Sequence, residues 1–505
     1  MSVNVTHLVV QLLCLVAALV GLPRWLRVAQ REHYLPGSSS WVANLWASVD
    51  PRTRYVGLLG PALLVVGVLT TPWIYLGAAA VSLVVPIGLP FRGRTSPLHW
   101  TSRVRRLAGL IAAIVLVLCL LLPFTAAFAA VALPFIVDLG LAVTRPVEER
   151  LSRRFLLQAK EKVATVQPTV VAITGSYGKT STKNYLAHLL ASTRSVLASP
   201  ASFNNAMGLS KAVNDALLPG TEVFIAEMGT YGPGEIEALC RVFPPDIAVL
   251  TAIGEMHLQR MKTRQGVLAA KAEITQGARA VVVNANDDLL RQLGDDCARR
   301  GQQVIRCSVT DVGADVALVD GHLHVGGEDL GVVELPETAV PGNAAVALGA
   351  ALALGEDLRL LLRRLADLPT VAHRLEAVAQ PGGSWILDDT YNSNPAGAAM
   401  AVRRAVELAG RSGGRAHVVT PGMVELGEVQ AERNEQLARD VAQSGVATLV
   451  VVGRTNGAAL VEGASGQSTA VVEVADRAAA VALVEQRSVP GDVVLFENDL
   501  PDHYP

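Results

Sequence analysis

The chain has 505 residues, of which 51% are hydrophobic and only 17% are charged, and its formal net charge is −2. This length is too great for one hydrophobic core and predicts about two or three domains. The near-neutral charge gives no basic footprint for nucleic acid, and a mean hydropathy of +0.37 indicates that part of the chain lies in lipid. The five cysteines show no C-x-x-C pair, which favours reduced thiols in a cytosolic environment.

The apolar excess is concentrated in residues 1–145. Blocks at 5–22, 55–91 and 107–143 are about one, two and two bilayer spans long. A cleaved signal peptide does not account for the two later blocks. We therefore expect a transmembrane region of about five helices, at 4–23, 55–71, 73–91, 107–123 and 124–143.

The loops of this region predict its orientation. Residues 23–54 and 92–106 contain five arginines each. Because cytoplasmic loops are enriched in Lys and Arg, we expect a multi-pass protein of the plasma membrane with its N-terminus outside. Everything after Arg145 then lies in the cytoplasm, where ATP is available. Asp138 is expected to be a polar residue at a helix end, so an anchor or lipid-facing platform is favoured over an ion path.

The rest of the chain has an α/β pattern. Residues 146–165 form a charged, amphipathic linker helix in this interpretation. Short β-branched runs then alternate with helical segments in 166–369, which predicts a doubly wound parallel sheet. Polar and Gly-rich alternation at 302–338 indicates antiparallel hairpins. A second alternating set predicts a smaller Rossmann-like domain at 370–505.

The run "TGSYGKTSTKN", residues 174–184, follows a predicted strand and precedes a predicted helix. Its glycines allow backbone N–H groups to converge on phosphate oxygens at the start of that helix. In such a loop Lys179 meets the β- and γ-phosphates and the Thr180 hydroxyl ligates Mg²⁺. The usual P-loop spacing requires glycine at position 173, where this chain has Ile173, so the loop is of a shorter kind.

Further motifs follow this loop in order: "SFNNAMGLS" (202–210), "FIAEMGTYGPGEI" (224–236), "LTAIGEMHLQRM" (250–261), "LAAKAEI" (268–274) and "LDDTYNSNPAG" (387–397). Together with the loop they resemble the Mur ligase family, the ATP-dependent amide ligases of peptidoglycan precursor synthesis. Within that family the chain is most similar to the D-alanyl-D-alanine-adding (MurF-type) ligases. The resemblance extends over roughly 165–490, about two thirds of the chain.

The resemblance implies an ATP site, a metal site and a catalytic set. The ATP-binding residues would be Thr174, Gly175, Ser176, Tyr177, Gly178, Lys179, Thr180, Ser181, Asn284, Asp287, Asn343, Arg374, Asp388 and Asp389. Two Mg²⁺ ions would be held by Thr180, Glu227, His257 and Lys271, the last as a carbamate formed with carbon dioxide. The catalytic residues would be Lys179, His257, Lys271 and Arg374. The substrate-binding residues would be Asn204, Asn205, Tyr391, Asn392 and Asn394.

Two departures from the family bear on which substrates the chain uses. Membrane helices stand where these ligases carry a domain that binds the uridine diphosphate of the precursor, and the acidic ending "ENDLPDHYP" replaces a basic one, which we expect to affect the amine-substrate side. The histidine that precedes Asn343 in the family is also missing, so the adenine pocket is expected to differ in detail.

We therefore expect a membrane-anchored, ADP-forming ligase of the bacterial plasma membrane. It would form an acyl phosphate on a UDP-linked or lipid-linked cell-envelope precursor and join an amino acid or dipeptide to it. One alternative is the UDP-N-acetylmuramoyl-tripeptide D-alanyl-D-alanine ligase proper. Another is a non-catalytic membrane scaffold with a ligase fold, which the intact Lys179, Glu227, His257 and Lys271 disfavour.

Overall fold

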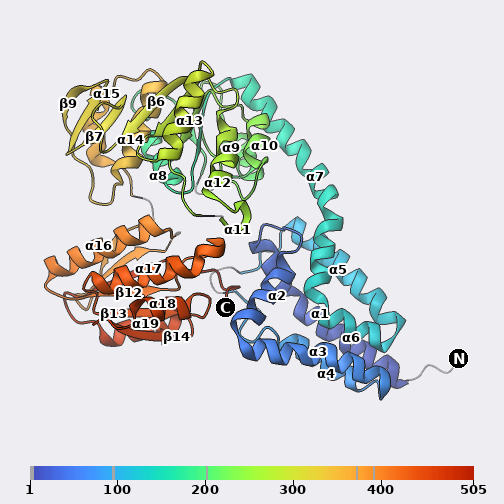
Figure 1. The fold of residues 1–505 in the computed structure, drawn as a ribbon. Helices are drawn as coiled ribbons and strands as arrows, with labels where there is room; N and C mark the ends of the chain where they lie inside the picture. Colours follow the sequence, from blue (N-terminus) through green and yellow to red (C-terminus); the bar gives the residue numbers. More distant parts are fainter. Residues whose placement is uncertain (1–4, 94–96, 201–202, 257, 371–373, 391–392) are drawn as a thin grey trace. The chain divides into compact units, whose positions relative to one another are not determined.

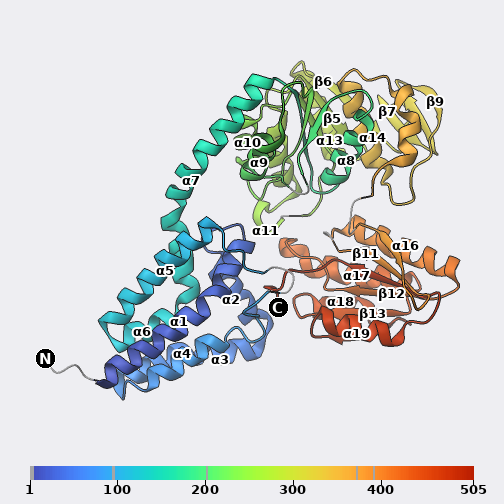
Figure 2. The same ribbon diagram turned by 180° about the vertical axis from the view of Figure 1, so that it is seen from behind.

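The computed structural model describes residues 5–93, 97–200, 203–256, 258–370, 374–390 and 393–505. The chain divides into two compact units, whose elements are labelled in Figures 1 and 2. The helical unit comprises Met1–Leu151, Gly453–Gly457 and Asp499–Pro505. The sheet unit comprises Ser152–Val452 and Ala458–Asn498.

The helical unit is built from α1 (Val5–Arg31), α2 (Ser38–Val49), α3 (Pro51–Leu69), α4 (Ile74–Val84), α5 (Ser102–Leu121), α6 (Pro123–Val131) and the first part of α7 (Leu133–Val166). Its core is rich in small residues, among them Ala17, Ala78 and Ala126. Small side chains let helices approach closely, as they do inside membranes. Large apolar side chains such as Leu58 and Leu120 are exposed, which fits a lipid-facing surface.

The prediction of five spanning helices is confirmed only in part. Within the described residues, α1, α3 and α5 are long and apolar enough to cross a membrane, and α6 with α7, bent by 79°, would count as a fourth span. The segment predicted at 73–91 forms only the 11-residue α4. Pro86 explains the shortening, because a proline disfavours helical backbone at the residue before it and cannot donate a helical hydrogen bond.

Two further features of the helical unit concern α7. Residues 146–165, predicted as a separate linker helix, form the second half of this continuous 34-residue helix. Asp138, on its first half, accepts hydrogen bonds from the backbone N–H groups of Ser39 (3.0 Å) and Ser40 (2.9 Å). The carboxylate therefore caps the N-terminus of α2, where the helix dipole favours a negative charge.

The first sheet of the sheet unit has nine strands in the order β2-β3-β1-β4-β5-β6-β7-β8-β9. They are β1 (Thr169–Thr174), β2 (Val196–Ala198), β3 (Val223–Glu227), β4 (Ile247–Leu250), β5 (Ala280–Asn284), β6 (Gln303–Ser308), β7 (Val316–Val319), β8 (His322–Val325) and β9 (Glu328–Val332). Pairs up to β6–β7 are parallel, whereas β7–β8 and β8–β9 are antiparallel. The sheet is thus mixed, not purely parallel, although the hairpins do lie within 302–338.

Both faces of this sheet are covered by helices. Val171 and Ile173 of β1 belong to one core with α8 (Lys179–Leu190) and α14 (Pro341–Ala353). Val170 and Ala172 belong to the other core, as expected because successive strand side chains point to opposite faces. That second core includes the end of α7 together with α9 (Ala206–Ala216), α10 (Glu235–Val242), α11 (Leu258–Met261), α12 (Arg264–Ala272) and α13 (Asp288–Arg299).

The second sheet has six strands in the order β10-β11-β15-β12-β13-β14. They are β10 (Glu376–Ala379), β11 (Trp385–Asp389), β12 (Ala416–Thr420), β13 (Thr448–Val452), β14 (Ala470–Val474) and β15 (Val493–Glu497). Only the β10–β11 pair is antiparallel. One core includes α16 (Pro395–Ser412), α17 (Gln430–Gln443) and α18 (Gly457–Ala464), and a smaller core includes α19 (Arg477–Arg487). The short α15 (Leu358–Leu361) packs in the first sheet's core.

Candidate nucleotide and metal site

The phosphate loop connects β1 to α8 at the edge of the sheet where the parallel strands end. β1 lies between β3 and β4, and the carboxyl ends of neighbouring strands are where α/β sheets bind ligands. The loop requires both glycines. A Cβ on Gly175 would lie 1.9 Å from Thr251 Oγ1, and one on Gly178, whose φ is 84°, would lie 2.4 Å from Asn343 Oδ1. Asn343, near the start of α14, therefore lies directly against the loop.

Hydrogen bonds fix the loop to the segments after β3 and β4. Thr174 Oγ1 donates to Met228 O (2.8 Å), and Ser176 N donates to Ala252 O (2.8 Å). Lys179 Nζ donates to Gly175 O (2.8 Å) and Ser176 O (3.4 Å), which places the ammonium within the loop. Burial lowers the pKa of Lys179, and the charge of nearby Arg374 acts in the same direction.

Glu227 ends β3 and receives two donors from α8. Thr180 Oγ1 lies 3.1 and 3.0 Å from its two carboxylate oxygens, and Lys183 Nζ lies 3.0 Å from Oε2. The side chains of Lys183 and Glu227 are each 2% exposed. Lys183 was not among the predicted site residues. Its only signal in the sequence is its position one helical turn after Lys179, since residues four apart lie on the same side of a helix.

The chemistry of the donor set fits a magnesium ion and a carbamate. Lys271, on α12, is 1% exposed, and burial holds its pKa well below the usual value, with the charge of Lys179 adding to this effect. The resulting neutral amine is the form that reacts with carbon dioxide. The Thr180 hydroxyl and the Glu227 carboxylate offer hard oxygen ligands, which Mg²⁺ prefers. Among the described residues no group of three or more His, Cys, Asp or Glu side chains forms a ready-made metal site, and His257 lies outside the described residues.

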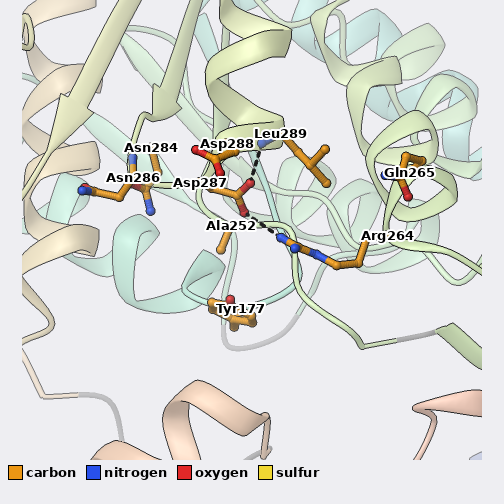
Figure 3. A pocket seen from close by; sticks show the side chains of 9 residues that line it. All are labelled: Tyr177, Ala252, Arg264, Gln265, Asn284, Asn286, Asp287, Asp288 and Leu289. Atoms are coloured by element: carbon orange, nitrogen blue, oxygen red, sulfur yellow. Dashed lines mark hydrogen bonds and ion pairs between the residues drawn. The ribbon is translucent and has the colours of Figure 1, made fainter. Parts of the chain in front are cut away.

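A cavity of about 710 Å³ opens beside the loop (Figure 3). It is lined by Tyr177, Ala252, Arg264, Gln265, Asn284, Asn286, Asp287, Asp288 and Leu289. The ring of Tyr177 lies on one side, and Asn284 and Asp287 lie on the other. The Asp287 carboxylate accepts from Ile253 N (2.9 Å) and Leu289 N (3.0 Å), which caps α13. An aromatic ring facing amide and carboxylate groups, in a cavity of this size, suits a nucleoside.

A second group of carboxylates ends the strands of the other sheet. Asp389 on β11 pairs in register with Glu497 on β15. Burial raises the pKa of Asp389 to about 6, against the effect of Arg374, and burial raises the pKa of Glu497 to about 7. Asp388 accepts from the backbone N–H and hydroxyl of Thr390 (3.0 and 2.6 Å). Glu497 was not predicted, although a carboxylate at the end of a strand was the same signal that identified Glu227.

The residues expected to bind substrate, and Ser181 of the expected ATP site, have separate placements. Asn205 accepts from Gly208 N (2.9 Å) and caps α9, and Asn394 accepts from Gly397 N (3.0 Å) and caps α16. Both side chains therefore have a structural role. Asn204 packs against Gly229, just after Glu227. Ser181 is buried in the first turn of α8. Tyr391 and Asn392 lie outside the described residues.

Comparison with protein families shows which family the chain belongs to. Residues 173–346 match the Mur ligase middle domain, and residues 373–497 match the glutamate ligase domain of Mur ligases, which together make more than half of the chain. The chain belongs to the Mur ligase family. As a Mur ligase it is an ATP-dependent enzyme that forms an amide bond and releases ADP.

The similar proteins described next are all ligases of one type. It is 33% identical over 358 residues to the UDP-N-acetylmuramoyl-tripeptide–D-alanyl-D-alanine ligase of Mycobacterium tuberculosis, covering 65% of this chain and 70% of the relative. The enzyme of that name from Bacillus subtilis is 28% identical over 356 residues, covering 67% and 75%. The crystal structure of the MurF ligase from Thermotoga maritima in complex with ADP has a TM-score of 0.59 and 27% identity, covering 69% of this chain and 80% of that one.

Proposed function

We propose that this Mur ligase is a membrane-anchored enzyme that uses ATP to join D-alanyl-D-alanine to the peptide of a peptidoglycan precursor. The observation that carries the proposal is the meeting of the phosphate loop, Lys179, Glu227 and Lys271 at one edge of the first sheet. The names of the relatives from M. tuberculosis and B. subtilis supply the two substrates. We assign the ATP-binding domain to 166–369 and the second domain to 370–505.

The reaction proceeds in two displacements. An oxygen of the precursor carboxylate attacks the γ-phosphorus of ATP, the bond from that phosphorus to the β-phosphate oxygen breaks, and ADP leaves an acyl phosphate. The amine nitrogen of the dipeptide then attacks the acyl carbon, phosphate leaves, and the nitrogen loses a proton. The protein contributes positioning and charge neutralisation, which the loop N–H groups, Lys179 and Arg374 supply.

Thr180 and Glu227 would hold one Mg²⁺ ion, and Lys271, once carbamylated, would add a carboxylate for a second ion, with His257 as the remaining candidate ligand. Bound Mg²⁺ neutralises the phosphate oxygens during transfer. The carbamate also changes the charge balance of the site. It would replace a buried neutral amine with an anion near Lys179, so that Lys179 and Lys183 would be matched by two negative groups, Glu227 and the carbamate.

The cavity beside the loop would hold the nucleoside of ATP. Tyr177, Asn284 and Asp287 line that cavity, and Asn343 lies against Gly178 of the loop. Asp388 and Asp389 would approach the nucleotide from the second sheet. The candidates for contact with substrate remain the five predicted residues Asn204, Asn205, Tyr391, Asn392 and Asn394.

The helical unit supports an attachment to the plasma membrane. Its described residues include three helices that are long and apolar enough to cross a membrane, or four spans if the bent α6–α7 pair is counted. The two arginine-rich loops support an orientation with the catalytic domains in the cytoplasm and the N-terminus outside. This orientation requires that α3 with α4, and α5 with the bent α6–α7 pair, each cross the membrane and return. A lipid-linked precursor is a second candidate substrate, favoured by the presence of this unit ahead of the matched residues.

Purified full-length protein in detergent tests these proposals. ADP and phosphate should be released in equal amounts only when ATP, Mg²⁺, D-alanyl-D-alanine and the UDP-linked or lipid-linked precursor are all present, and Lys179→Ala should abolish release. Comparison of the two precursors identifies the substrate. No ADP release with either precursor, from protein that still binds ATP, would favour the scaffold instead.

A further inference from the structure

The last seven residues, Asp499–Pro505, leave the sheet unit directly after β15 and belong to the helical unit. So does the segment Gly453–Gly457. The sheet unit is therefore connected to the helical unit by more than α7. This tail, "DLPDHYP", is acidic and contains His503 and Tyr504 just before Pro505. The side chains of Asp502, His503 and Tyr504 have partners on α1, directly after α1 and on α2, respectively.

Polar and aromatic contacts seat the tail on the end of α1 and on α2. Trp46 Nε1 donates to His503 O at 2.9 Å. His503 Nε2 lies 2.9 Å from Glu32 Oε1, and the His503 side chain is 1% exposed. The rings of Trp41 and Tyr504 meet edge to face, with 6.2 Å between their centroids. A buried imidazole and a buried indole N–H, each with a partner, are typical of a formed interface.

Charge also matches across this surface. Arg27 of α1 is among the largest fully buried side chains of the protein, and it donates to the backbone carbonyl of Pro90 at 2.9 Å. Asp502 of the tail brings its carboxylate to 3.8 Å from Arg27 Nη1. Because a buried charge is costly without a counter-charge, the acidic residue of the tail stabilises the interior of the helical unit.

The second segment, Gly453–Gly457, contacts the tail at Pro505. The backbone N–H groups of Arg454 and Thr455 and the Thr455 hydroxyl all donate to Pro505 O, at 3.2, 3.1 and 2.6 Å. Arg454 Nη1 also reaches Asp50 Oδ1 at 2.5 Å, with the arginine 49% exposed. The Asp50 carboxylate is 1% exposed, so this ion pair adds a second contact of the helical unit beside those made by the tail.

We propose that the end of α1 and α2, with Arg27, Glu32, Trp41 and Trp46, form a docking surface for the C-terminal tail of the same chain. The tail is then a clasp, a second link between the sheet unit and the helical unit in addition to α7. This inference goes beyond the proposed function and does not depend on the substrate. It also gives the acidic ending a task other than the binding of the amine substrate.

Cleavage of α7 in the folded protein tests the clasp. A specific protease site is inserted after Arg154, which is exposed on α7, and the full chain is cleaved in lipid nanodiscs and separated by size. We expect the fragment that contains the sheet unit to stay with the nanodisc. Removal of residues 499–505 should release it, and His503→Ala combined with Tyr504→Ala should release a large part of it. Retention of the tail-deleted fragment equal to that of the intact protein would overturn the proposal.

Two controls separate docking from misfolding and from exchange between copies. Binding of a fluorescent ADP analogue and the thermal unfolding temperature of the cleaved sheet unit should be unchanged by the tail deletion, since the deletion begins after the last strand. A photo-crosslinking benzoylphenylalanine at position 504 should join the tail to residues 38–49 within one chain. A crosslinked dimer would show that the surface accepts the tail of a second copy and would contradict the clasp.

Discussion

Replacement of Lys183 by methionine should destabilise the catalytic domain strongly. The Lys183 ammonium lies 3.0 Å from Glu227, and both side chains are 2% exposed. Removing one partner of a buried ion pair costs about 3–5 kcal/mol, because the other charge stays buried. Thr180 still donates to the carboxylate, so we expect the lower end, about 3 kcal/mol. For a domain of this size that corresponds to a fall in Tm of roughly 6–12 °C.

Thermal unfolding in metal-free buffer measures this effect, and Lys211→Met is the matched control. Lys211 pairs with Asp215 on the surface, with side chains 58% and 56% exposed, and its loss should change stability by at most about 0.5 kcal/mol. The double variant Lys183→Met, Glu227→Gln should regain part of the lost stability, since it removes the buried carboxylate charge. A fall in Tm for Lys183→Met no larger than that for Lys211→Met would refute the reasoning.

Three further predictions concern the phosphate loop, the buried carboxylate of Glu497 and the carbamate of Lys271. Gly175→Ala should abolish ATP binding measured by calorimetry, because its Cβ would lie 1.9 Å from Thr251 Oγ1, whereas Gly410→Ala, in open space on α16, should leave it intact. Burial raises the pKa of Glu497 from the usual 4.5 to about 7 in the folded state. Between these pH values the folded state binds more protons than the unfolded state, so the free energy of unfolding falls by roughly 2–3 kcal/mol as pH rises to 7. Tm should therefore fall from pH 5 to pH 8, and Glu497→Gln should flatten that slope. Labelled bicarbonate should give a carbamate ¹³C NMR signal that Lys271→Arg removes, and an unchanged signal in that variant would place the carbamate elsewhere.

The local parts of the site were predictable from sequence. A buried β-branched strand, a glycine-rich turn and a helix are short-range features, so the loop from Thr174 to Thr180 could be located before its surroundings. Glu227 and Lys271 were implied by family resemblance, and the parallel strands bring their segments to one edge because the carboxyl ends of such strands lie together.

Long-range pairings were not predictable in this way. Nothing near Lys183 in the sequence indicates that it pairs with Glu227, which is 44 residues away. Glu497 meets Asp389 only because β15 inserts beside β11. The amide side chains of Asn205 and Asn394 matched family motifs, yet the structure uses them as helix caps, a role that the same residue type fills before any helix.

The membrane helices show the same limit. Composition located the apolar blocks, but where each helix ends depends on local backbone constraints, so Pro86 shortens α4. The acidic tail was expected to affect the amine-substrate side, which stays a prediction; the contacts of His503 with Trp46 on α2 and with Glu32 just after α1 were not predicted. A contact between residues more than 400 positions apart leaves no pattern in a single sequence.

Oxygen transfer from the precursor carboxylate to the released phosphate distinguishes a ligase that forms an acyl phosphate from a scaffold. The precursor is labelled with ¹⁸O in its acceptor carboxylate and incubated with the full-length protein, ATP, Mg²⁺ and D-alanyl-D-alanine, and the released phosphate is analysed by mass spectrometry. Transfer through an acyl phosphate predicts one labelled oxygen in each phosphate formed. Unlabelled phosphate released alongside the amide product, or phosphate released at the same rate without the dipeptide, would contradict the assignment.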